Sequence, residues 1–244
     1  MDRLDKILAS QNLGSRKEVG AMIRKGRVCV NGERVCRPDH KLDPEKDTVS
    51  VDGNPLRFAR QVYYMMHKPA GVLSASRDPH APTVLDLLRP DQKRRGLFPA
   101  GRLDKDTEGL LILTDDGAFA HRMLSPRSRV FKRYIAVLDR PADPEDVRAF
   151  AEGLVLEDGL RCLPARLCLL EGSAAQVDLC EGKFHQVKRM FAARGKTVVH
   201  LKRVQIGGLV LDGALLPGQA RELSAEECAS VFLPLPEDRL KIQK

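Results

Sequence analysis

The chain lacks several features that often reveal where a protein works. Its 244 residues contain no tryptophan, and aromatic residues make up only 5% of them. No run of about 18 consecutive apolar residues occurs, so we expect no membrane span. Residues 1–6 are mostly charged and lack the apolar core of a signal peptide. We therefore expect a cytoplasmic protein that has no membrane partner.

The six cysteines also lack a recognisable pattern, because no two of them form a Cys-x-x-Cys pair. Without that ligand spacing we predict no zinc site and no other bound metal. In a reducing cytoplasm the thiols should stay free rather than form a disulfide framework. The chain also lacks the Gly-x-x-x-x-Gly-Lys-Ser/Thr phosphate loop and the His-Glu-x-x-His motif. These absences disfavour a nucleotide-hydrolysing enzyme and a metal helix.

The chain carries an excess of positive charge. Lysine and arginine total 41 against 33 acidic residues, which gives a formal net charge of +8. Such an excess favours a polyanionic partner such as nucleic acid. A merely basic soluble protein has the same composition, so charge alone leaves both interpretations open.

Local signals in residues 1–55 predict a small module of two helices and a hairpin. Ser15 and Glu18 form a capping box at the start of the second helix, and Gly26 is placed to end it in a left-handed conformation. Asn31-Gly32 joins two short apolar segments, which is the strongest short signal for a hairpin. Apolar residues recur at helical spacing at Leu4, Ile7 and Leu8, and again at Val19, Met22 and Ile23.

Cations gather on this module. They form either a solvated helix face or a surface that follows the phosphates of RNA. The order of a helix, Ser-Arg-Lys and Gly-x-Val-x-Val-Asn-Gly resembles the alpha-L RNA-binding motif, an S4-like domain named after a small-subunit ribosomal protein. The resemblance favours the phosphate surface and implies an S4-like domain over residues 1–57, followed by a linker at 58–62. The cations expected to bind RNA are Arg3, Lys6, Arg16, Lys17, Arg24, Lys25 and Arg27.

The remaining residues, 63–244, show irregularly alternating strand and helix signals. The helices are few and short, and no Gly-x-Gly-x-x-Gly follows a strand. We therefore predict an α+β fold with a mostly antiparallel sheet rather than a doubly wound fold. Strands are expected at 62–67, 109–114, 130–138, 175–180, 197–203 and 206–211. Helices are expected at 83–88, 117–124, 144–152 and 186–194, and after Ser224.

The first segment with candidate catalytic groups is 101–117. Asp104 stands there between Arg102 and Lys105, in a polar loop that runs into an apolar stretch of the buried-strand type. Neighbouring cations keep a carboxylate ionised and can also hold a phosphate backbone. For a lone aspartate, a surface turn paired with one of these cations is the simpler interpretation.

Two further segments carry groups of the same kind. Tyr134, in the expected strand 130–138, either packs in the core or offers its ring to an unstacked base. In 181–191, Lys188 and Arg189 lie at the start of a helix, where basic side chains are poorly placed. A nearby carboxylate or phosphate would compensate, and Asp104 is a candidate for that carboxylate.

Together these segments resemble the pseudouridine synthases, in particular the family typified by the small-ribosomal-subunit enzyme. The matching motifs are Gly-Arg-Leu-Asp-x-Asp-Thr-x-Gly-Leu at 101–110, Lys-x-Tyr at 132–134 and Glu-Gly-x-x-His-Gln-Val-Lys-Arg-Met-Phe at 181–191. Lys-Pro-x-Gly at 68–71 and Ile-Gly-Gly at 206–208 fit as well. With the N-terminal module, the resemblance spans nearly the whole chain.

The resemblance implies that a uridine in RNA is isomerised to its C-glycoside without a cofactor. Asp104 matches the family's essential aspartate, which acts either as a nucleophile at the ribose C1′ or as a base at C2′. Lys188 matches the basic partner of that aspartate, and Arg189 is the second choice. Tyr134 matches the residue that stacks on the target base.

Other residues of these motifs receive expected roles as well. Arg102 matches a residue that enters the RNA helix when the uridine is flipped out, a step the buried glycosidic bond requires. Lys68 and Lys105 are expected to bind RNA. Asp106 is expected to structure the loop through Thr107 and backbone NH groups.

The segments 78–83 and 125–127 look closest to the enzyme of 16S rRNA, so we expect 16S rRNA or the assembling small ribosomal subunit as the partner. Three alternatives stay open. They are a synthase acting on 23S rRNA, a non-catalytic RNA-binding assembly protein, and a glycosylase that excises a flipped base. We expect a monomer, because no apolar helix face is left over.

Overall fold

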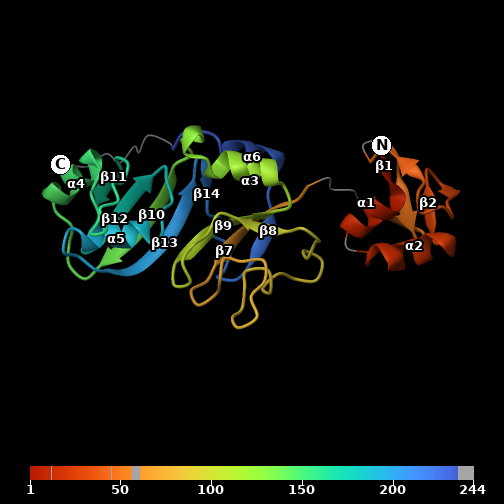
Figure 1. The fold of residues 1–244 in the computed structure, drawn as a ribbon, viewed down its shortest axis with the longest axis horizontal. Coiled ribbons are helices and arrows are strands. Elements are labelled where there is room, and N and C mark those ends of the chain that lie inside the picture. The colour runs from red at the N-terminus through yellow and green to blue at the C-terminus, as the bar shows by residue number, and fades with distance from the viewer. Residues whose placement is uncertain (12, 45, 57–60, 236–244) are drawn as a thin grey trace. The chain divides into compact units, whose positions relative to one another are not determined.

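The computed structural model describes residues 1–11, 13–44, 46–56 and 61–235. The chain forms two compact units, which Figure 1 colours from red to blue along the sequence. The first comprises Met1–Val62 with Arg89–Leu97, and the second comprises Tyr63–Leu88 with Phe98–Lys244. Of the predicted linker, residues 58–60 lie outside the described ones.

The first unit packs two helices against short strands. The predicted capping box is confirmed, because the Glu18 backbone NH donates to Ser15 Oγ at 3.3 Å and the Ser15 NH donates to Glu18 Oε2 at 2.7 Å. The predicted apolar faces are also confirmed, with Leu4, Leu8, Val19 and Ile23 all fully buried. The elements are β1 (Asp2–Arg3), α1 (Leu4–Ser10), α2 (Arg16–Arg24), β2 (Val28–Val30), β3 (Glu33–Arg34), β4 (Lys41–Leu42), β5 (Val49–Val51) and β6 (Asn54–Leu56).

The sheet of this unit is larger than the sequence predicted. Asn31 and Gly32 have φ angles of 52° and 84°, so the predicted hairpin turn is present. Its strand β2 also pairs with β5, and β5 pairs with β6, which gives the order β3-β2-β5-β6. No local signal marks the β2–β5 pairing. Pro55 is tolerated in β6 because this strand lies at the edge of the sheet.

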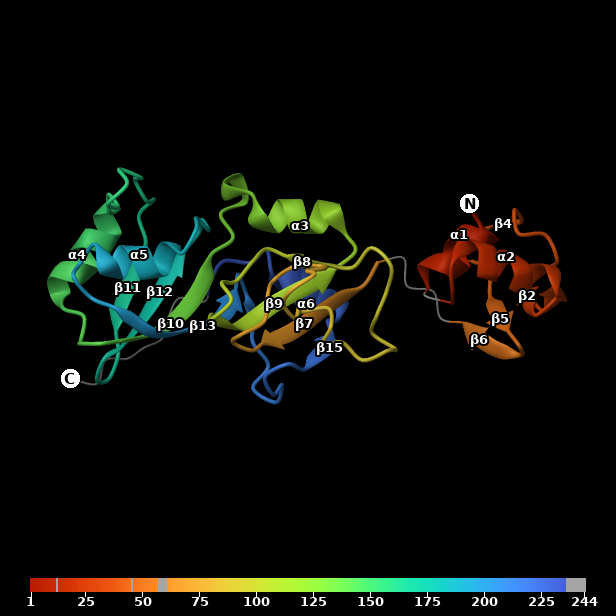
Figure 2. The same cartoon turned by 60° about the horizontal axis from the view of Figure 1, so that its bottom comes forward.

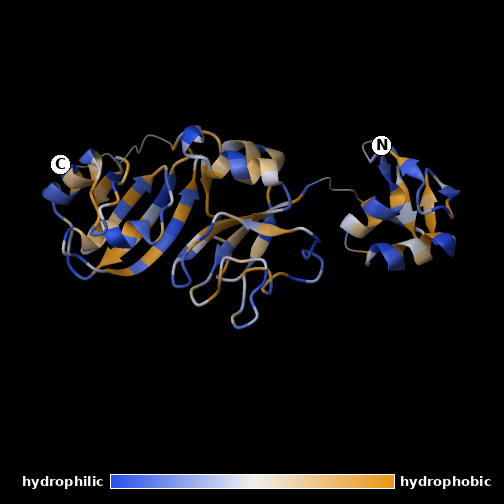
Figure 3. Ribbon diagram, viewed as in Figure 1, coloured by the Kyte–Doolittle hydropathy of each residue, from blue (hydrophilic) through white to orange (hydrophobic). Residues whose placement is uncertain are grey.

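The second unit is built on one large sheet with the order β11-β12-β10-β13-β9-β7-β15, to which β8 and β14 add at β9 and β13. Every named pairing in it is antiparallel except β9 with β13, so the prediction of a mostly antiparallel sheet is confirmed. Figure 3 shows apolar and polar residues in alternating bands along its strands. The strands are β7 (Tyr63–Lys68), β8 (Phe98–Ala100), β9 (Glu108–Thr114), β10 (Lys132–Leu138), β11 (Arg166–Leu169), β12 (Ala174–Leu179), β13 (Val198–Ile206), β14 (Leu209–Val210) and β15 (Ala220–Glu222).

Short helices accompany this sheet. Helix α4 lies against β11 and α5 against β13, whereas α3 lies beside β8 (Figure 2). Helix α4 begins at Pro144 after a capping box made by Asp143 and Asp146. The helices are α3 (Gly117–Leu124), α4 (Pro144–Glu152), α5 (Gln186–Ala192) and α6 (Ala225–Ser230), with a 3-10 turn at Pro126–Ser128.

Two of the predicted elements are wrong in detail. Residues 83–88 form successive turns and not a helix, because Asp86 Oδ2 accepts hydrogen bonds from both the backbone NH and the Oγ1 of Thr83. The strand expected at 206–211 is divided, since β13 runs to Ile206 and a turn at residues 207–208 leads into β14.

The parallel pairing of β9 with β13 requires a glycine. Gly109 has a φ of +106° and lies opposite Arg203. A Cβ atom at Gly109 would lie 2.1 Å from the Arg203 carbonyl oxygen, which is closer than any contact two such atoms can make. This close approach sets where the loop 101–107 enters the sheet.

A buried lysine holds the same loop from inside. Lys68, at the end of β7, is 0% exposed. Its Nζ donates to the carbonyl oxygens of Pro69, Lys105 and Thr107 at 2.9, 3.2 and 2.9 Å. Burial lowers the pKa of this lysine to about 8. The expectation that Lys68 binds RNA is therefore wrong, because its ammonium group is satisfied by backbone carbonyls inside the protein.

We predict that Gly109→Ala destabilises the protein by about 2–4 kcal/mol, because the left-handed backbone and the Arg203 carbonyl both oppose a side chain. Urea denaturation measures this loss. Gly213→Ala is the matched control, since its Cβ meets no atom within 4 Å. The control should change stability by less than about 0.5 kcal/mol. Equal stabilities for the two variants would contradict the proposed constraint.

We also predict that Lys68→Met lowers stability by about 2–4 kcal/mol at pH 7, because it leaves three carbonyls without their donor. The exposed Lys41→Met serves as the control and should have little effect. Between about pH 8 and 10.5 the unfolded state binds more protons at Lys68 than the folded state does, so wild-type stability should rise relative to the Met variant. A stability difference independent of pH across this range would count against a buried, protonated Lys68.

Candidate active site

An open pocket in the second unit collects residues from distant parts of the sequence. The pocket is small and open to solvent, with a cavity volume of about 60 Å³. The loop 101–107, strand β10 and the turn before α5 all contribute to it. Its polar lining includes Arg102, Asp104, Thr107, Tyr134, His185 and Gln186. The structure thus brings together Asp104, Tyr134 and Arg102, which the sequence singled out separately.

Asp104 faces two basic groups from the start of α5. Its Oδ2 lies 3.5 Å from Lys188 Nζ, and its Oδ1 lies 3.7 Å from His185 Nε2. The Asp104 side chain is 25% exposed, so the carboxylate is accessible from the pocket but not fully solvated. Lys188 is therefore placed beside Asp104, as the sequence analysis expected.

The shortest contact of Lys188 is nevertheless with a different carboxylate. Its Nζ donates to Asp106 Oδ1 at 2.5 Å, and this bond lowers the pKa of Asp106. We expected Asp106 to bond with Thr107 and the backbone; it does meet its own backbone NH, but its main partner is Lys188 and not Thr107. The Thr107 Oγ1 is buried and has no hydrogen-bond partner among the described residues. Lys188 is shared between two carboxylates of one loop.

Tyr134 lies in β10 with its ring largely buried at the pocket. Its hydroxyl accepts a long hydrogen bond of 3.4 Å from Arg203 Nη1. Arg203 lies on β13, is only 4% exposed, and also donates from Nε to the Leu110 carbonyl at 2.8 Å. Sequence reasoning missed Arg203, because a basic residue in an alternating strand normally points to solvent.

A second buried cation lies in β10. Lys132 is buried, and burial followed by repulsion from Arg203 lowers its pKa to about 8. Its neighbour Arg133 is neutralised by a bidentate pair with Asp178, at 2.7 and 2.8 Å. Of the buried cations Lys132 and Arg203, Arg203 contacts the pocket through the Tyr134 hydroxyl, and neither lines the pocket itself.

The other predicted cations of this unit have different environments. Arg189 pairs with Asp158 at 2.5 Å and is not part of the pocket lining. Lys105 is exposed on the loop, and Arg102 is exposed where it lines the pocket. Arg189, our second choice as partner of Asp104, is thus engaged elsewhere.

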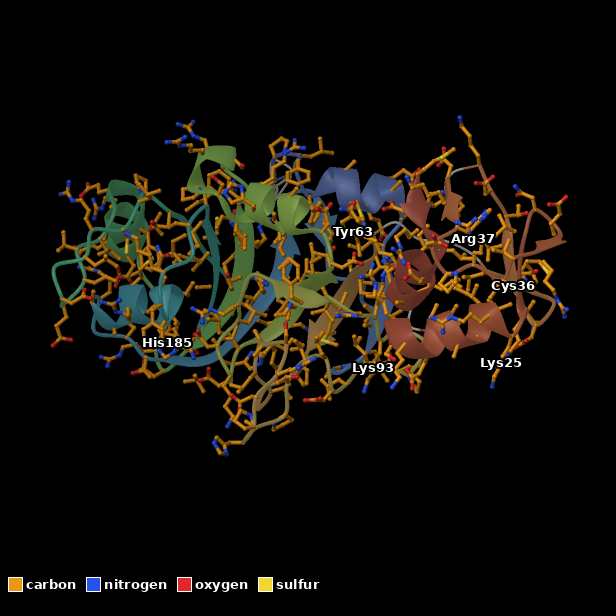
Figure 4. The ribbon with its side chains drawn as sticks, turned by 45° about the vertical axis from the view of Figure 1, so that its right-hand side comes forward. Lys25, Cys36, Arg37, Tyr63, Lys93 and His185 are labelled. Carbon is orange, nitrogen blue, oxygen red and sulfur yellow. The ribbon has the colours of Figure 1, made fainter. Side chains whose placement is uncertain are left out.

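His185 is a site residue that the sequence analysis did not select. It precedes α5 in a left-handed conformation, with φ 48° and ψ 33°, and its ring lines the pocket. Figure 4 labels this side chain near the start of α5. The histidines are scattered in the sequence, so only the fold shows that this one lies beside Asp104.

The predicted cations of the first unit fall into two groups. Arg3, Lys6 and Arg27 each pair with a carboxylate, namely Asp5, Asp2 and Asp52. The other group comprises the exposed Arg16, Lys17, Arg24 and Lys25, of which Figure 4 labels Lys25.

Some classes of site are not found. Among the described residues no three His, Cys, Asp or Glu side chains form a group that could hold a metal ion. In the same part of the chain no helix is long and apolar enough to cross a membrane. All six cysteines are free thiols.

Comparisons with known proteins agree with this geometry. The RNA pseudouridylate synthase family matches residues 62–193, and the S4 domain matches residues 2–49. The RNA pseudouridine synthase YtzG of Bacillus subtilis (strain 168) is 44% identical over 229 residues, which cover 92% of this chain and 96% of the relative. Ribosomal small subunit pseudouridine synthase A of Escherichia coli (strain K12) is 44% identical over 231 residues, or 94% and 99% of the two chains.

The fold has a solved counterpart as well. A crystal structure of a pseudouridylate synthase matches with a TM-score of 0.67 and 35% identity, and the match covers 95% of this chain and 100% of the other. The predicted resemblance, the S4 domain and the α+β fold are thereby confirmed. This chain belongs to the RNA pseudouridine synthase family, whose members are isomerases.

Proposed function

We propose that this protein converts a uridine of ribosomal RNA, most specifically of 16S rRNA, to pseudouridine. The observation that carries the proposal is the position of Asp104 beside Lys188 in a pocket that Tyr134 also lines. The 16S target is supported by the relative from Escherichia coli, which is named a ribosomal small subunit pseudouridine synthase. The partner is then 16S rRNA or the assembling small subunit.

The reaction breaks the bond between uracil N1 and the ribose C1′ and forms a bond between C5 and C1′. The proton that C5 loses is balanced by the proton that N1 gains, so the product is an isomer of the substrate. Asp104 acts at the sugar, either by attacking C1′ or by taking a proton from C2′. Either step needs an ionised carboxylate, and the Lys188 ammonium group lies 3.5 Å from the Asp104 carboxylate. No cofactor is needed, because bond cleavage and bond formation occur within one nucleotide.

Tyr134 and Arg102 position the substrate and do not act on the glycosidic bond. The Tyr134 ring supports the flipped uracil, and Arg203 holds its hydroxyl from behind. Arg102 enters the RNA helix in place of the flipped uridine, because a stacked nucleotide does not expose its glycosidic bond. Lys105 contacts phosphate at the edge of the site, and Arg189 fixes α5 through Asp158.

The first unit contributes to the affinity for RNA through its positively charged side chains. Arg16, Lys17, Arg24 and Lys25 follow the phosphates, whereas Arg3, Lys6 and Arg27 contribute less because carboxylates already neutralise them. In this proposal the domains are 1–57 and 63–244 with a linker at 58–62, and the enzyme is a cytoplasmic monomer.

The test uses purified protein with 16S and 23S rRNA, as free transcripts and in partly assembled subunits, and maps pseudouridine by carbodiimide labelling. One modified uridine in 16S rRNA is expected. Asp104→Asn should lower its formation by at least about a thousandfold while RNA affinity changes by less than about twofold. Asp106→Asn, two residues away, is the control, and its expected loss is below about tenfold because Asp104 retains Lys188. Modification of 23S rRNA alone would refute the 16S target, and an active Asp104→Asn variant would refute the catalytic assignment.

A second prediction concerns the S4 domain. Replacing Arg16, Lys17, Arg24 and Lys25 with alanine should reduce the slope of log K against log[salt] by about 3 for binding to 16S rRNA. Replacing the ion-paired Arg3 and Lys6 should reduce it by less than about 1. If both variants keep the wild-type slope, this helix face does not contact phosphates.

A further inference from the structure

Phe184 presents an aromatic ring to solvent beside the candidate active site. Its exposed fraction is 73%, and it is the only aromatic among the large hydrophobic residues exposed in the described ranges. One exposed phenylalanine is not unusual in itself. This ring, however, stacks on the ring of His185, with 3.8 Å between centroids and 17° between planes. One face of Phe184 is thus covered, and the other is open.

The turn that carries this aromatic pair is rigid. The Lys183 backbone NH donates to Gln186 Oε1 at 2.9 Å, and the Gln186 side-chain amide donates to the buried Glu181. Glu181 in turn accepts from the Leu163 NH at 2.8 Å, and Lys183 Nζ donates to the Arg161 carbonyl at 2.6 Å. Because both ends of the turn are hydrogen-bonded, its backbone is held in place, and the stacking on His185 orients the Phe184 ring.

The backbone conformation of His185 is also consistent with a turn that its surroundings hold in place. His185 has a left-handed conformation, which is uncommon for a residue with a side chain, and no side-chain hydrogen bond caps α5 there. Such conformations persist where the surrounding structure enforces them, often at functional sites. Here the conformation places the His185 Nε2 3.7 Å from Asp104 Oδ1, while the same ring stacks on Phe184.

We propose that the open face of Phe184 binds an unstacked base of the nucleotide next to the modified uridine. This inference rests on the proposed function, because it takes the uridine to be held at Asp104. His185 links the two positions, since its ring touches Asp104 on one side and Phe184 on the other. The ring spacing of 3.8 Å is close to the rise of about 3.4 Å between stacked bases. A base on Phe184 therefore continues the stack that His185 begins.

The charges around the aromatic pair favour RNA over a protein as the occupant. Arg102 and Lys105 are exposed on the loop that carries Asp104, and Arg161 is exposed on the segment that holds Lys183. An aromatic ring within a cationic surface is the usual arrangement for single-stranded nucleic acid, because the ring stacks on the base while the cations bind the backbone.

The test compares Phe184→Leu, which keeps an apolar side chain but loses the ring, with Phe184→Tyr, which keeps the ring. On 16S rRNA the Leu variant should lower kcat/KM about tenfold, in line with the loss of one stacked base, and the Tyr variant should stay within about twofold. Leu216→Ala is the matched control, because Leu216 is an apolar residue with 63% exposure that lies outside the pocket lining. An unchanged kcat/KM in Phe184→Leu would overturn the proposal.

An abasic nucleotide then identifies the partner of the ring. Each neighbour of the modified uridine is replaced in turn by an abasic site. At one position the abasic site should lower kcat/KM of the wild type about tenfold. It should not lower kcat/KM of Phe184→Leu further, since that variant already lacks the same stacking contact. If the two losses multiply at both positions, Phe184 does not bind a neighbouring base.

A measurement without turnover separates this inference from the proposed function. In an Asp104→Asn background, an oligoribonucleotide with 2-aminopurine next to a uridine should increase in fluorescence on binding, because the base leaves the RNA stack, and Phe184→Leu should abolish the increase. Absence of this increase in the Asp104→Asn protein overturns the stacking proposal even if the enzyme is active. Conversely, the increase without pseudouridine formation by the wild type would refute the proposed function and retain the aromatic site.

Discussion

The conformation of the Asp104 loop depends on two lysines that hold it from opposite sides. Lys68 lies inside the protein and binds the carbonyl oxygens of Lys105 and Thr107. Lys188 lies at the pocket and faces the carboxylates of Asp104 and Asp106. Along the loop, Lys105 and Thr107 give their backbone carbonyls to Lys68, and the residues that alternate with them, Asp104 and Asp106, give their carboxylates to Lys188. The alternation fixes the side on which Asp104 is presented.

The position of Lys188 at the start of α5 follows from the same arrangement. A positive charge at a helix N-terminus is repelled by the helix dipole. Two carboxylates within 3.5 Å offset that repulsion, so the loop and the helix stabilise each other across the pocket. The loop therefore keeps Lys188 beside the carboxylates, and Lys188 keeps the loop against α5. The loop is in turn placed by Gly109, whose lack of a side chain allows β9 to meet β13.

Sequence reasoning mostly succeeded where the signal was local, with the turns at 83–88 as an exception, and failed where the signal was not local. The capping box at Ser15 and the turn at Asn31 were predicted correctly, because each depends on residues within a few positions. Lys68 was assigned to RNA, since a sequence shows a charge but not whether three carbonyls surround it.

The same limit applied to the partners of the site residues. Arg203 meets the Tyr134 hydroxyl only because β10 pairs with β13, and His185 meets Asp104 only across the folded pocket. The motifs singled out Asp104 in the loop and Lys188 in α5, which the structure places side by side. They did not predict that Lys188 binds Asp106 more closely than Asp104.

The chemistry of the pocket alone does not explain how one uridine is selected. Contacts to phosphate are indifferent to sequence, so under the proposed function the cations of the S4 domain would raise affinity for any RNA. A pocket for one flipped uracil accepts a uridine from any position that can be unstacked. Selection must therefore depend on the neighbouring nucleotides. It depends on the free energy needed to unstack them and on the contacts that they gain when unstacked. The Phe184 ring lies beside Asp104 because both contact the ring of His185. In the proposed complex it favours the binding of RNA in which a neighbouring base leaves the stack together with the uridine.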